Sequence, residues 1–160
     1  MLLPYQPDAS PQMGPQRLPP INILDGMLAM GIKHHRQSRL PDAERIYRAI
    51  LAIDSRHAGT LYMLGMLAHQ VGRLDVAVQL LSGAIGLEPG HAEYHCRLGS
   101  IFQAQGKLDL AACSYRRSLD LDPSNTEAQM NLDDVRHSQQ GPSDVAKCSS
   151  RPGMQAGLVG

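Results

Sequence analysis

The chain has 160 residues, a length that suits one domain. Its 15 basic residues balance its 15 acidic residues, so charge gives no support for a nucleic-acid or membrane-surface partner. Tryptophan is absent and phenylalanine occurs once, so Leu, Ile, Val, Ala and Met must build the core, which favours packed helices over a β-sandwich.

The first segment, residues 1–21, contains six prolines and predicts a disordered leader. Two leucines near its start are followed at once by Pro4, and no basic residue precedes them, so the segment does not resemble a signal peptide. The longest apolar stretch, near residues 21–32, is broken by Asn22 and Asp25 and is too short for a membrane helix. We therefore expect a cytoplasmic protein with no membrane partner.

The central segment, residues 22–137, repeats with a period of 34 residues. Small, apolar and basic residues each recur in phase over three copies. The recurring sets are Gly31, Gly65 and Gly99; Ala43, Ala77 and Ala111; Leu40, Leu74 and Leu108; Arg39, Arg73 and Lys107; and Tyr47, Leu81 and Tyr115. A fixed period of this size indicates a solenoid of stacked repeats.

Each period divides into two helices. The predicted first helices span 22–37, 58–71 and 92–105, and the predicted second helices span 41–54, 75–87 and 109–121. Gly72 and Gly106 lie where helix C-caps are expected, with Ser38 at that place in the first period. Three aspartates near the starts of the second helices are placed to cap free N–H groups, namely Asp42, Asp75 and Asp109.

After the third period, residues 126–137 start the pattern again without a second helix. Asp133 takes the place of the repeated glycine, which predicts a polar helix that covers the end of the array. Residues 138–160 are rich in Ser, Gly and Gln and predict a disordered tail.

The pattern resembles the tetratricopeptide repeat (TPR). The second period supplies Leu61, Leu64, Gly65, Ala68, Ala77, Leu81, Ala84 and Pro89, and the third supplies Leu98, Gly99, Phe102, Ala111, Tyr115 and Pro123. The resemblance implies an all-α fold, a right-handed α-solenoid of three TPR helix pairs plus a C-terminal capping helix. The implied repeats are about 24–57, 58–91 and 92–125, with the capping helix at 126–137.

In the family, the first helices line a concave groove, and set positions of each repeat face a partner. The corresponding residues here are Leu28, Ile32, His35, Arg36, Tyr62, Met66, His69, Gln70, Cys96, Ser100 and Gln103. This set has an apolar centre at Leu28, Ile32, Tyr62 and Met66 and a polar rim, the usual layout of a protein-binding patch. The resemblance thus implies a non-catalytic module that binds a protein or peptide. The alternative is that some of these apolar residues pack against the leader or a second copy of the chain.

Comparison with two groups of TPR proteins narrows the range of partners that we expect. TPR domains that hold C-terminal Glu-Glu-Val-Asp tails use a clamp of Lys, Arg and Asn, whereas the matching positions here are Leu28, Ile32, Met63, Glu93 and Arg97, of which Arg97 alone fits. The repeats also resemble, less closely, those ahead of the catalytic domain in bacterial O-GlcNAc-transferase-like proteins, although the Asn ladders of that group are missing apart from Asn131. A glycosyltransferase recognition region and a self-assembling homo-oligomer remain alternative functions.

No residue cluster predicts catalysis, a cofactor or a metal. The most metal-like string is His91 to His95, but Glu93 is two residues after His91 and, at about 100° per residue, points away from both imidazoles. No third ligand is apparent, and catalytic zinc needs three. Four arginines on the second helices, Arg45, Arg48, Arg116 and Arg117, are expected on solvated outer faces and do not predict nucleic-acid binding.

Overall fold

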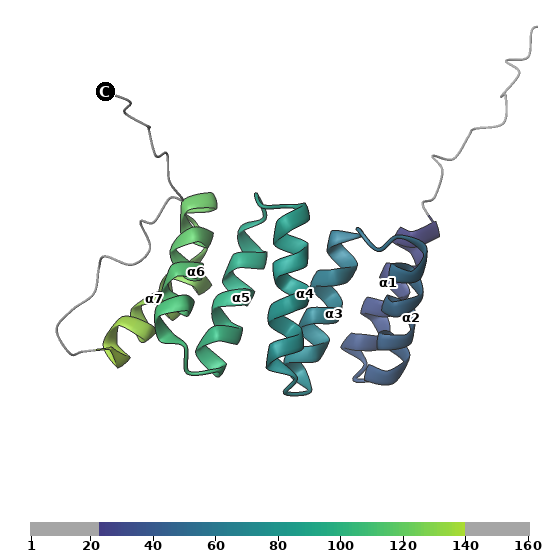
Figure 1. Ribbon diagram of the computed structural model, residues 1–160, viewed down its shortest axis with the longest axis horizontal. Helices are drawn as coiled ribbons and strands as arrows, with labels where there is room; N and C mark the ends of the chain where they lie inside the picture. The colour runs from purple at the N-terminus through teal and green to yellow at the C-terminus, as the bar shows by residue number, and fades with distance from the viewer. Residues whose placement is uncertain (1–22, 140–160) are drawn as a thin grey trace, which may run out of the picture.

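The computed structural model describes residues 23–139, which form seven α-helices and no β-strand (Figure 1). The helices are α1 (Ile23–Arg36), α2 (Leu40–Ile53), α3 (Ala58–Gln70), α4 (Leu74–Leu87), α5 (Ala92–Ala104), α6 (Leu108–Leu121) and α7 (Thr126–Ser138). The predicted leader, and all but the first residues of the predicted tail, lie outside the described residues. Between Ile23 and Gln139, no helix has the length and apolar character that crossing a membrane requires.

The helices pack as consecutive pairs, α1 with α2, α3 with α4, and α5 with α6, and α7 covers the last pair (Figure 1). The first helices of successive repeats also touch one another, α1 with α3, α3 with α5, and α5 with α7. This arrangement confirms the all-α solenoid of three helix pairs with a C-terminal capping helix. Observed helix ends agree with the predicted ends to within one residue.

The turn inside each helix pair is set by one residue in the left-handed region. Gly72 has φ 77°, Gly106 has φ 72°, and Ser38 has φ 59° in the first pair. The next N–H in each turn reaches back to the last turn of the first helix, as in Arg73 N–H to Ala68 O at 2.8 Å. The predicted C-caps are therefore confirmed, and the serine adopts the geometry that glycine takes more easily.

Close approach within each pair explains the repeated glycines. A Cβ atom built on Gly31 would lie 2.5 Å from Tyr47 Cε1, and one on Gly99 would lie 2.6 Å from Tyr115 Cε1. Both tyrosines are fully buried, so moving either ring away from the new Cβ would disturb the core around it. The period thus places a bulky core residue of the second helix directly under the glycine of the first.

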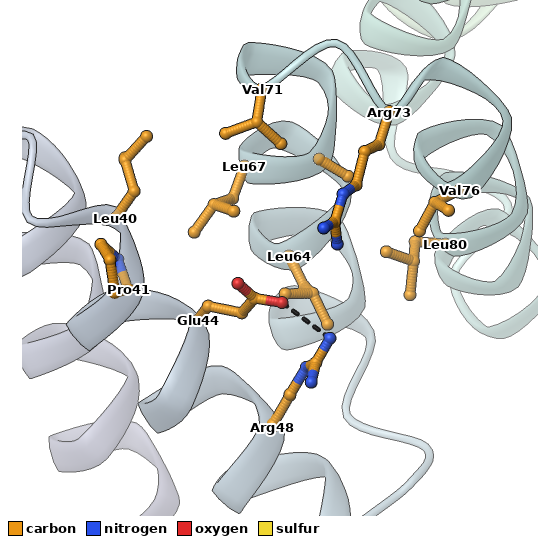
Figure 2. A pocket seen from close by; sticks show the side chains of 11 residues that line it. Leu40, Pro41, Glu44, Arg48, Leu64, Leu67, Val71, Arg73, Val76 and Leu80 are labelled. Carbon is orange, nitrogen blue, oxygen red and sulfur yellow. Dashed lines mark ion pairs between the residues drawn. The ribbon is translucent and has the colours of Figure 1, made fainter.

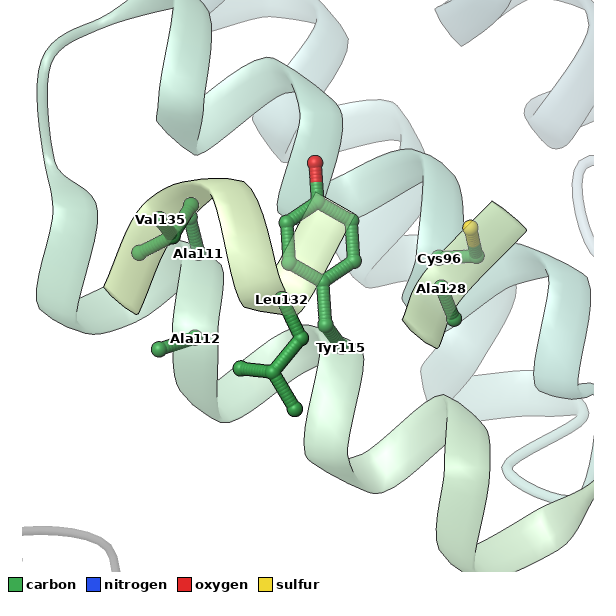
Figure 3. Packing of buried hydrophobic residues seen from close by; sticks show 7 residues of the cluster. All are labelled: Cys96, Ala111, Ala112, Tyr115, Ala128, Leu132 and Val135. Carbon is green, nitrogen blue, oxygen red and sulfur yellow. The ribbon is translucent and has the colours of Figure 1, made fainter. Parts of the chain in front are cut away.

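The capping helix α7 closes the core of the third pair (Figure 3). Ala128, Leu132 and Val135 lie on one face of α7, and all three are buried. They pack against Ala111, Ala112 and Tyr115 of α6 and against Cys96 of α5. Asp133 lies on α7 where the earlier repeats have glycine, and its carboxylate accepts hydrogen bonds from Gln129 at 2.9 Å and Arg136 at 3.2 Å.

The aspartates at the starts of the second helices do not cap them as predicted. The N-cap residues are Arg39, Arg73 and Lys107, and none makes a side-chain capping bond. Asp75 instead accepts a 2.8 Å hydrogen bond from Gln105 Nε2, and Asp109 accepts one of 2.8 Å from Gln139 Nε2. Each bond joins the second helix of one repeat to the C-terminal end of the next helix in the chain, α4 to α5 and α6 to α7. These carboxylates therefore link one repeat to the next.

Candidate functional site

The candidate site is the inner wall, the layer made by α1, α3, α5 and α7. The eleven predicted partner-binding residues come from its first three helices. Leu28, Ile32, His35 and Arg36 lie on α1; Tyr62, Met66, His69 and Gln70 on α3; and Cys96, Ser100 and Gln103 on α5. Spacings of three and four residues place each set on one face of its helix.

Most of these residues are partly accessible. Ile32, Tyr62 and Met66 are half-buried, whereas Arg36 and Gln70 are exposed. Leu28 is half-buried as well, but it also packs against the core cluster of Ala43, Tyr47 and Leu67. The apolar centre of the inner wall is therefore continuous with the core beneath it.

Cys96 is an exception and corrects the prediction for this position. Its side chain is 1% exposed and packs with Ala128 and Tyr115 under α7. Burial, with a smaller contribution from the Glu127 carboxylate, raises the pKa of the Cys96 thiol to about 11. The repeat position predicted a groove residue, but the capping helix covers it, so a partner on the inner wall cannot reach this sulfur.

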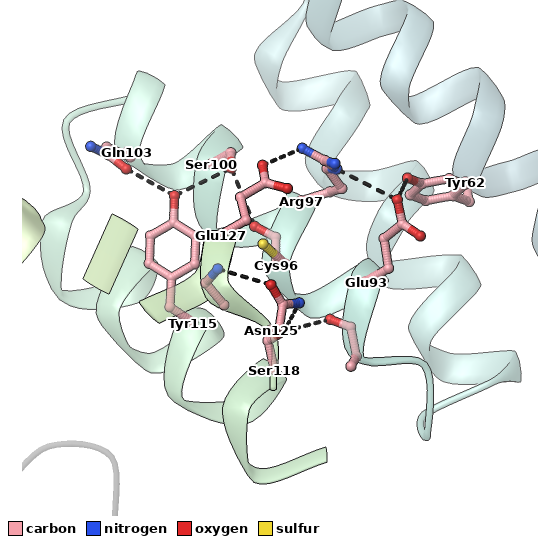
Figure 4. A network of polar contacts seen from close by, with 12 residues as sticks. Tyr62, Glu93, Cys96, Arg97, Ser100, Gln103, Tyr115, Ser118, Asn125 and Glu127 are labelled. Atoms are coloured by element: carbon pink, nitrogen blue, oxygen red, sulfur yellow. Dashed lines mark hydrogen bonds and ion pairs between the residues drawn. The ribbon is translucent and has the colours of Figure 1, made fainter. Parts of the chain in front are cut away.

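A chain of polar contacts links the first helices of the second and third repeats to the capping helix (Figure 4). Tyr62 Oη donates a 2.8 Å hydrogen bond to Glu93 Oε1, and Arg97 Nε lies 3.7 Å from the same carboxylate oxygen. Arg97 also donates a 2.5 Å bond to Glu127 Oε1 on α7. Burial, reinforced by the Glu93 carboxylate, raises the pKa of Tyr62 above its usual range. Sequence reasoning did not find this network, although Glu93 and Glu127 share one repeat position.

The buried tyrosine beneath the inner wall has different polar neighbours in the first and third repeats. Tyr115 Oη donates to Gln103 Oε1 at 2.8 Å and lies 3.3 Å from Ser100 Oγ. Tyr47 is the corresponding tyrosine two periods earlier. There, Ile32 takes the place of the serine and His35 takes the place of the glutamine. The buried Tyr47 hydroxyl has no hydrogen-bond partner among the described residues, and burial raises its pKa to about 12.

His35 contributes to the wall through a contact between repeats. Its Nε2 atom lies 2.8 Å from Gln70 Oε1, which joins the ends of α1 and α3. Its ring makes an edge-to-face contact with the Tyr47 ring, with the ring centroids 6.3 Å apart and the planes 64° apart. Both His35 and Gln70 were predicted as partner-binding residues, and the structure brings them together at the C-terminal ends of their helices.

Comparison with known families agrees with this geometry. The family profile described as Tetratricopeptide repeat matches residues 28–92 and residues 62–126, which together make up more than half of the chain. The chain belongs to the tetratricopeptide-repeat family. No curated protein matches it.

Solved TPR structures superpose on most of the described residues. The O-GlcNAc transferase of Thermobaculum terrenum, solved as a mutant, has a TM-score of 0.70 and 27% sequence identity. The match covers 73% of this chain but 22% of the transferase chain, so this chain spans less than a quarter of that protein. The first TPR of Spaghetti, solved with the HSP90 peptide SRMEEVD, has a TM-score of 0.69 and 22% identity, covering 72% of this chain and 91% of the other. The Yersinia enterocolitica chaperone SycD, in complex with a peptide of the translocator YopD, has a TM-score of 0.69 and 14% identity, covering 74% and 95%. The likeness to Spaghetti and SycD shows the TPR fold alone.

The histidine string of the third TPR serves local packing. His91 is the N-cap residue of α5 and stacks on Tyr94 with the ring centroids 4.6 Å apart. His95 Nε2 lies 3.2 Å from the carbonyl oxygen of Pro89. Within residues 23–139, no group of three or more His, Cys, Asp or Glu side chains is placed to hold a metal ion.

Proposed function

We propose that this TPR chain is a non-catalytic interaction module that holds a protein or peptide partner on its inner wall. The observation that carries the proposal is the apolar centre of Ile32, Tyr62 and Met66 on neighbouring first helices, half-buried and flanked by the exposed Arg36 and Gln70. An apolar centre within a polar rim is typical of protein-binding patches. The first TPR of Spaghetti and the chaperone SycD were each solved with a bound peptide, which supports the same type of role here.

The inner wall is also partly preorganised for binding. Tyr62 is held by its bond to Glu93 and by stacking on Tyr94, with the ring centroids 4.8 Å apart. A side chain fixed before binding loses less conformational freedom when the partner arrives. The wall therefore offers Tyr62 as a rigid contact and Met66, one turn along α3, as an adaptable one.

A second candidate function rests on the likeness to the Thermobaculum terrenum O-GlcNAc transferase at 27% identity. In that case, the inner wall would recognise proteins for a glycosyltransferase catalytic domain, on the same chain or encoded separately. Co-purification of such a catalytic domain with the chain would favour this role. A third candidate, a self-assembling scaffold, predicts a homo-oligomer, which light scattering of the purified chain would detect. The cytoplasmic location stays a prediction.

The experiment that tests the main proposal is an affinity pull-down with paired variants. Met66→Glu places a charge in the apolar centre of the inner wall, whereas Arg45→Ala alters an 80% exposed side chain on α2. Mass spectrometry should find proteins that the wild-type chain and Arg45→Ala retain and Met66→Glu loses. If all three chains retain the same proteins, or if Arg45→Ala alone loses them, the inner wall is not the binding surface.

A further inference from the structure

A cleft on the layer of second helices lies between α2 and α4 and is floored by α3 (Figure 2). Its volume is about 520 Å³. The walls are mainly aliphatic, with Leu40, Leu64, Leu67, Val71, Val76 and Leu80 among the lining residues. We propose that this cleft is a second docking site, separate from the inner wall, which takes a helix of a partner protein bearing a large aliphatic side chain one turn from a carboxylate.

At the first junction, between the first and second repeats, apolar residues replace a contact that the later two junctions share. Gln105 bonds to Asp75 at the second junction, and Gln139 bonds to Asp109 at the third, both at 2.8 Å. One period before Gln105 and Asp75, the residues are Val71 and Pro41. Two apolar side chains cannot form that bond, and both line the cleft instead. Val71 is 46% exposed and Val76 is 44% exposed, so the cleft presents apolar surface to solvent.

The charge of the cleft is the reason for expecting a carboxylate on the partner. Arg48 Nη2 lies 2.7 Å from Glu44 Oε1 in an ion pair, so these two lining residues neutralise each other. Arg73 makes no side-chain hydrogen bond or ion pair with residues 23–139, and its guanidinium extends over the cleft between Leu67 and Leu80 (Figure 2). Two guanidinium groups and one carboxylate leave one net positive charge beside the apolar walls. A carboxylate on the partner would complete this pair, with the planar two-donor geometry that arginine offers to carboxylates.

The shape of the cleft favours a helix. Pro41, Glu44 and Arg48 recur at three- and four-residue steps along α2, and Arg73, Val76 and Leu80 do so at the start of α4. The two walls therefore run along about two helical turns, or roughly 10 Å. A helix lying between them can insert one aliphatic side chain and present a carboxylate one turn away, because residues four apart share a face.

Methyl NMR tests the proposal with a defined probe. The full chain, labelled at Ile, Leu and Val methyl groups, is titrated with a stapled helical peptide that carries leucine and glutamate one turn apart. A matched peptide has lysine in place of the glutamate. We expect shifts at the Leu40, Leu67 and Val76 methyls, and a Kd for the glutamate peptide about tenfold lower than for the lysine peptide.

Charge reversal provides the decisive comparison. Arg73→Glu should invert the preference, so that the lysine peptide binds more tightly than the glutamate peptide. Lys107→Glu, at the same repeat position one period later, should leave the preference unchanged. Arg73 and Lys107 are both exposed, so circular dichroism should show unchanged helicity in both variants.

Three outcomes would overturn the proposal. The first is that the two peptides bind equally and Arg73→Glu changes neither affinity. The second is that the chemical shift changes fall on Leu28 and Ile32 of the inner wall. The third is that light scattering finds a dimer that Val76→Lys dissociates. The last result would show that a second copy of the chain occupies the cleft.

Discussion

The hydroxyl of Tyr62 donates a 2.8 Å hydrogen bond to Oε1 of Glu93 and so joins the second repeat to the third on the inner wall. The same ring stacks on Tyr94, with the planes 25° apart. Tyr62 is thus both part of the contact between two repeats and the aromatic member of the apolar centre. Each of these roles can be tested with a separate substitution.

Tyr62→Ala should weaken binding of an inner-wall partner by at least about 2 kcal/mol, because binding energy concentrates on a few central, aromatic-rich contacts. Tyr62→Phe keeps the ring and the stack on Tyr94 but removes the bond to Glu93, so it should lower the free energy of unfolding by about 0.5–1.5 kcal/mol. Calorimetry with a partner recovered by pull-down measures the first effect, and urea unfolding measures the second. Arg45→Ala is the control, and a normal affinity for Tyr62→Ala would exclude Tyr62 as a central contact.

The HSP90 peptide SRMEEVD, which the Spaghetti TPR was solved with, should not bind this chain. Arg97 is the one basic residue at the matching clamp positions, and Glu93 and Glu127 already flank it. Each absent charge-assisted hydrogen bond loses about 1.5–3 kcal/mol, and Glu93 repels the peptide carboxylates. Calorimetric titration should detect no heat of binding, with the Spaghetti domain as the positive control. Micromolar binding would contradict the prediction.

Gly99→Ala should destabilise the chain by about 1 kcal/mol. The new Cβ would lie 2.6 Å from the buried Tyr115 ring, and such overpacking costs about 1–3 kcal/mol, from which a helix-propensity gain of about 1 kcal/mol is subtracted. Gly86→Ala in α4 is the matched control, because its Cβ would meet no atom within 4 Å. Urea unfolding should show lower stability for the first variant and equal or higher stability for the second. Equal effects of the two substitutions would refute the packing explanation.

Alkaline pH should destabilise the fold through its buried tyrosines. Burial raises the pKa of Tyr47 to about 12, and burial with the Glu88 bond raises that of Tyr94 to about 12, against about 10 in an unfolded chain. Above pH of about 10, the unfolded chain loses tyrosine protons that the folded chain keeps, so the free energy of unfolding falls as pH rises. Urea unfolding across this range, with tyrosinate absorbance followed in parallel, measures the effect. A constant free energy of unfolding through this range would contradict it.

The missing contact at the first junction can be supplied by design. Pro41→Asp combined with Val71→Gln copies the residues that bond at the later two junctions. The new hydrogen bond should add about 0.5–1.5 kcal/mol of stability beyond the sum of the single variants. A double-mutant cycle by urea unfolding gives this coupling directly. A coupling of zero would show that the first junction is stacked differently from the other two.

Local residue chemistry and the period together predicted most of the fold. The left-handed turns at Gly72 and Gly106 follow from residue type, and the glycines of the first helices follow from the bulky partner one helix later. These features depend on neighbours within one repeat, so a single period contains the information for them.

Contacts between repeats were harder to predict. Cys96 fits a groove position by its place in the period, yet α7 packs over it. Asp75 fits a capping position by its place in α4, yet its partner is Gln105, 30 residues later. In both positions, the stacking of neighbouring repeats decides the side chain's environment, and the spacing of residues within one repeat does not contain that information.

The difference in contacts between successive repeats has a mechanical consequence. The later two junctions have the Gln-to-Asp bonds, whereas the first has the His35 to Gln70 contact, a longer contact of 3.8 Å between His57 and Asp25, and an apolar cleft on the other layer. Helix α2 also packs less extensively on α3 than α4 does on α5 or α6 on α7. Under a bending load, strain concentrates at the most weakly packed junction, so the first repeat should flex against a stiffer block formed by the rest. The curvature that the array presents to a long partner is then adjusted mainly at one joint, near its N-terminal end.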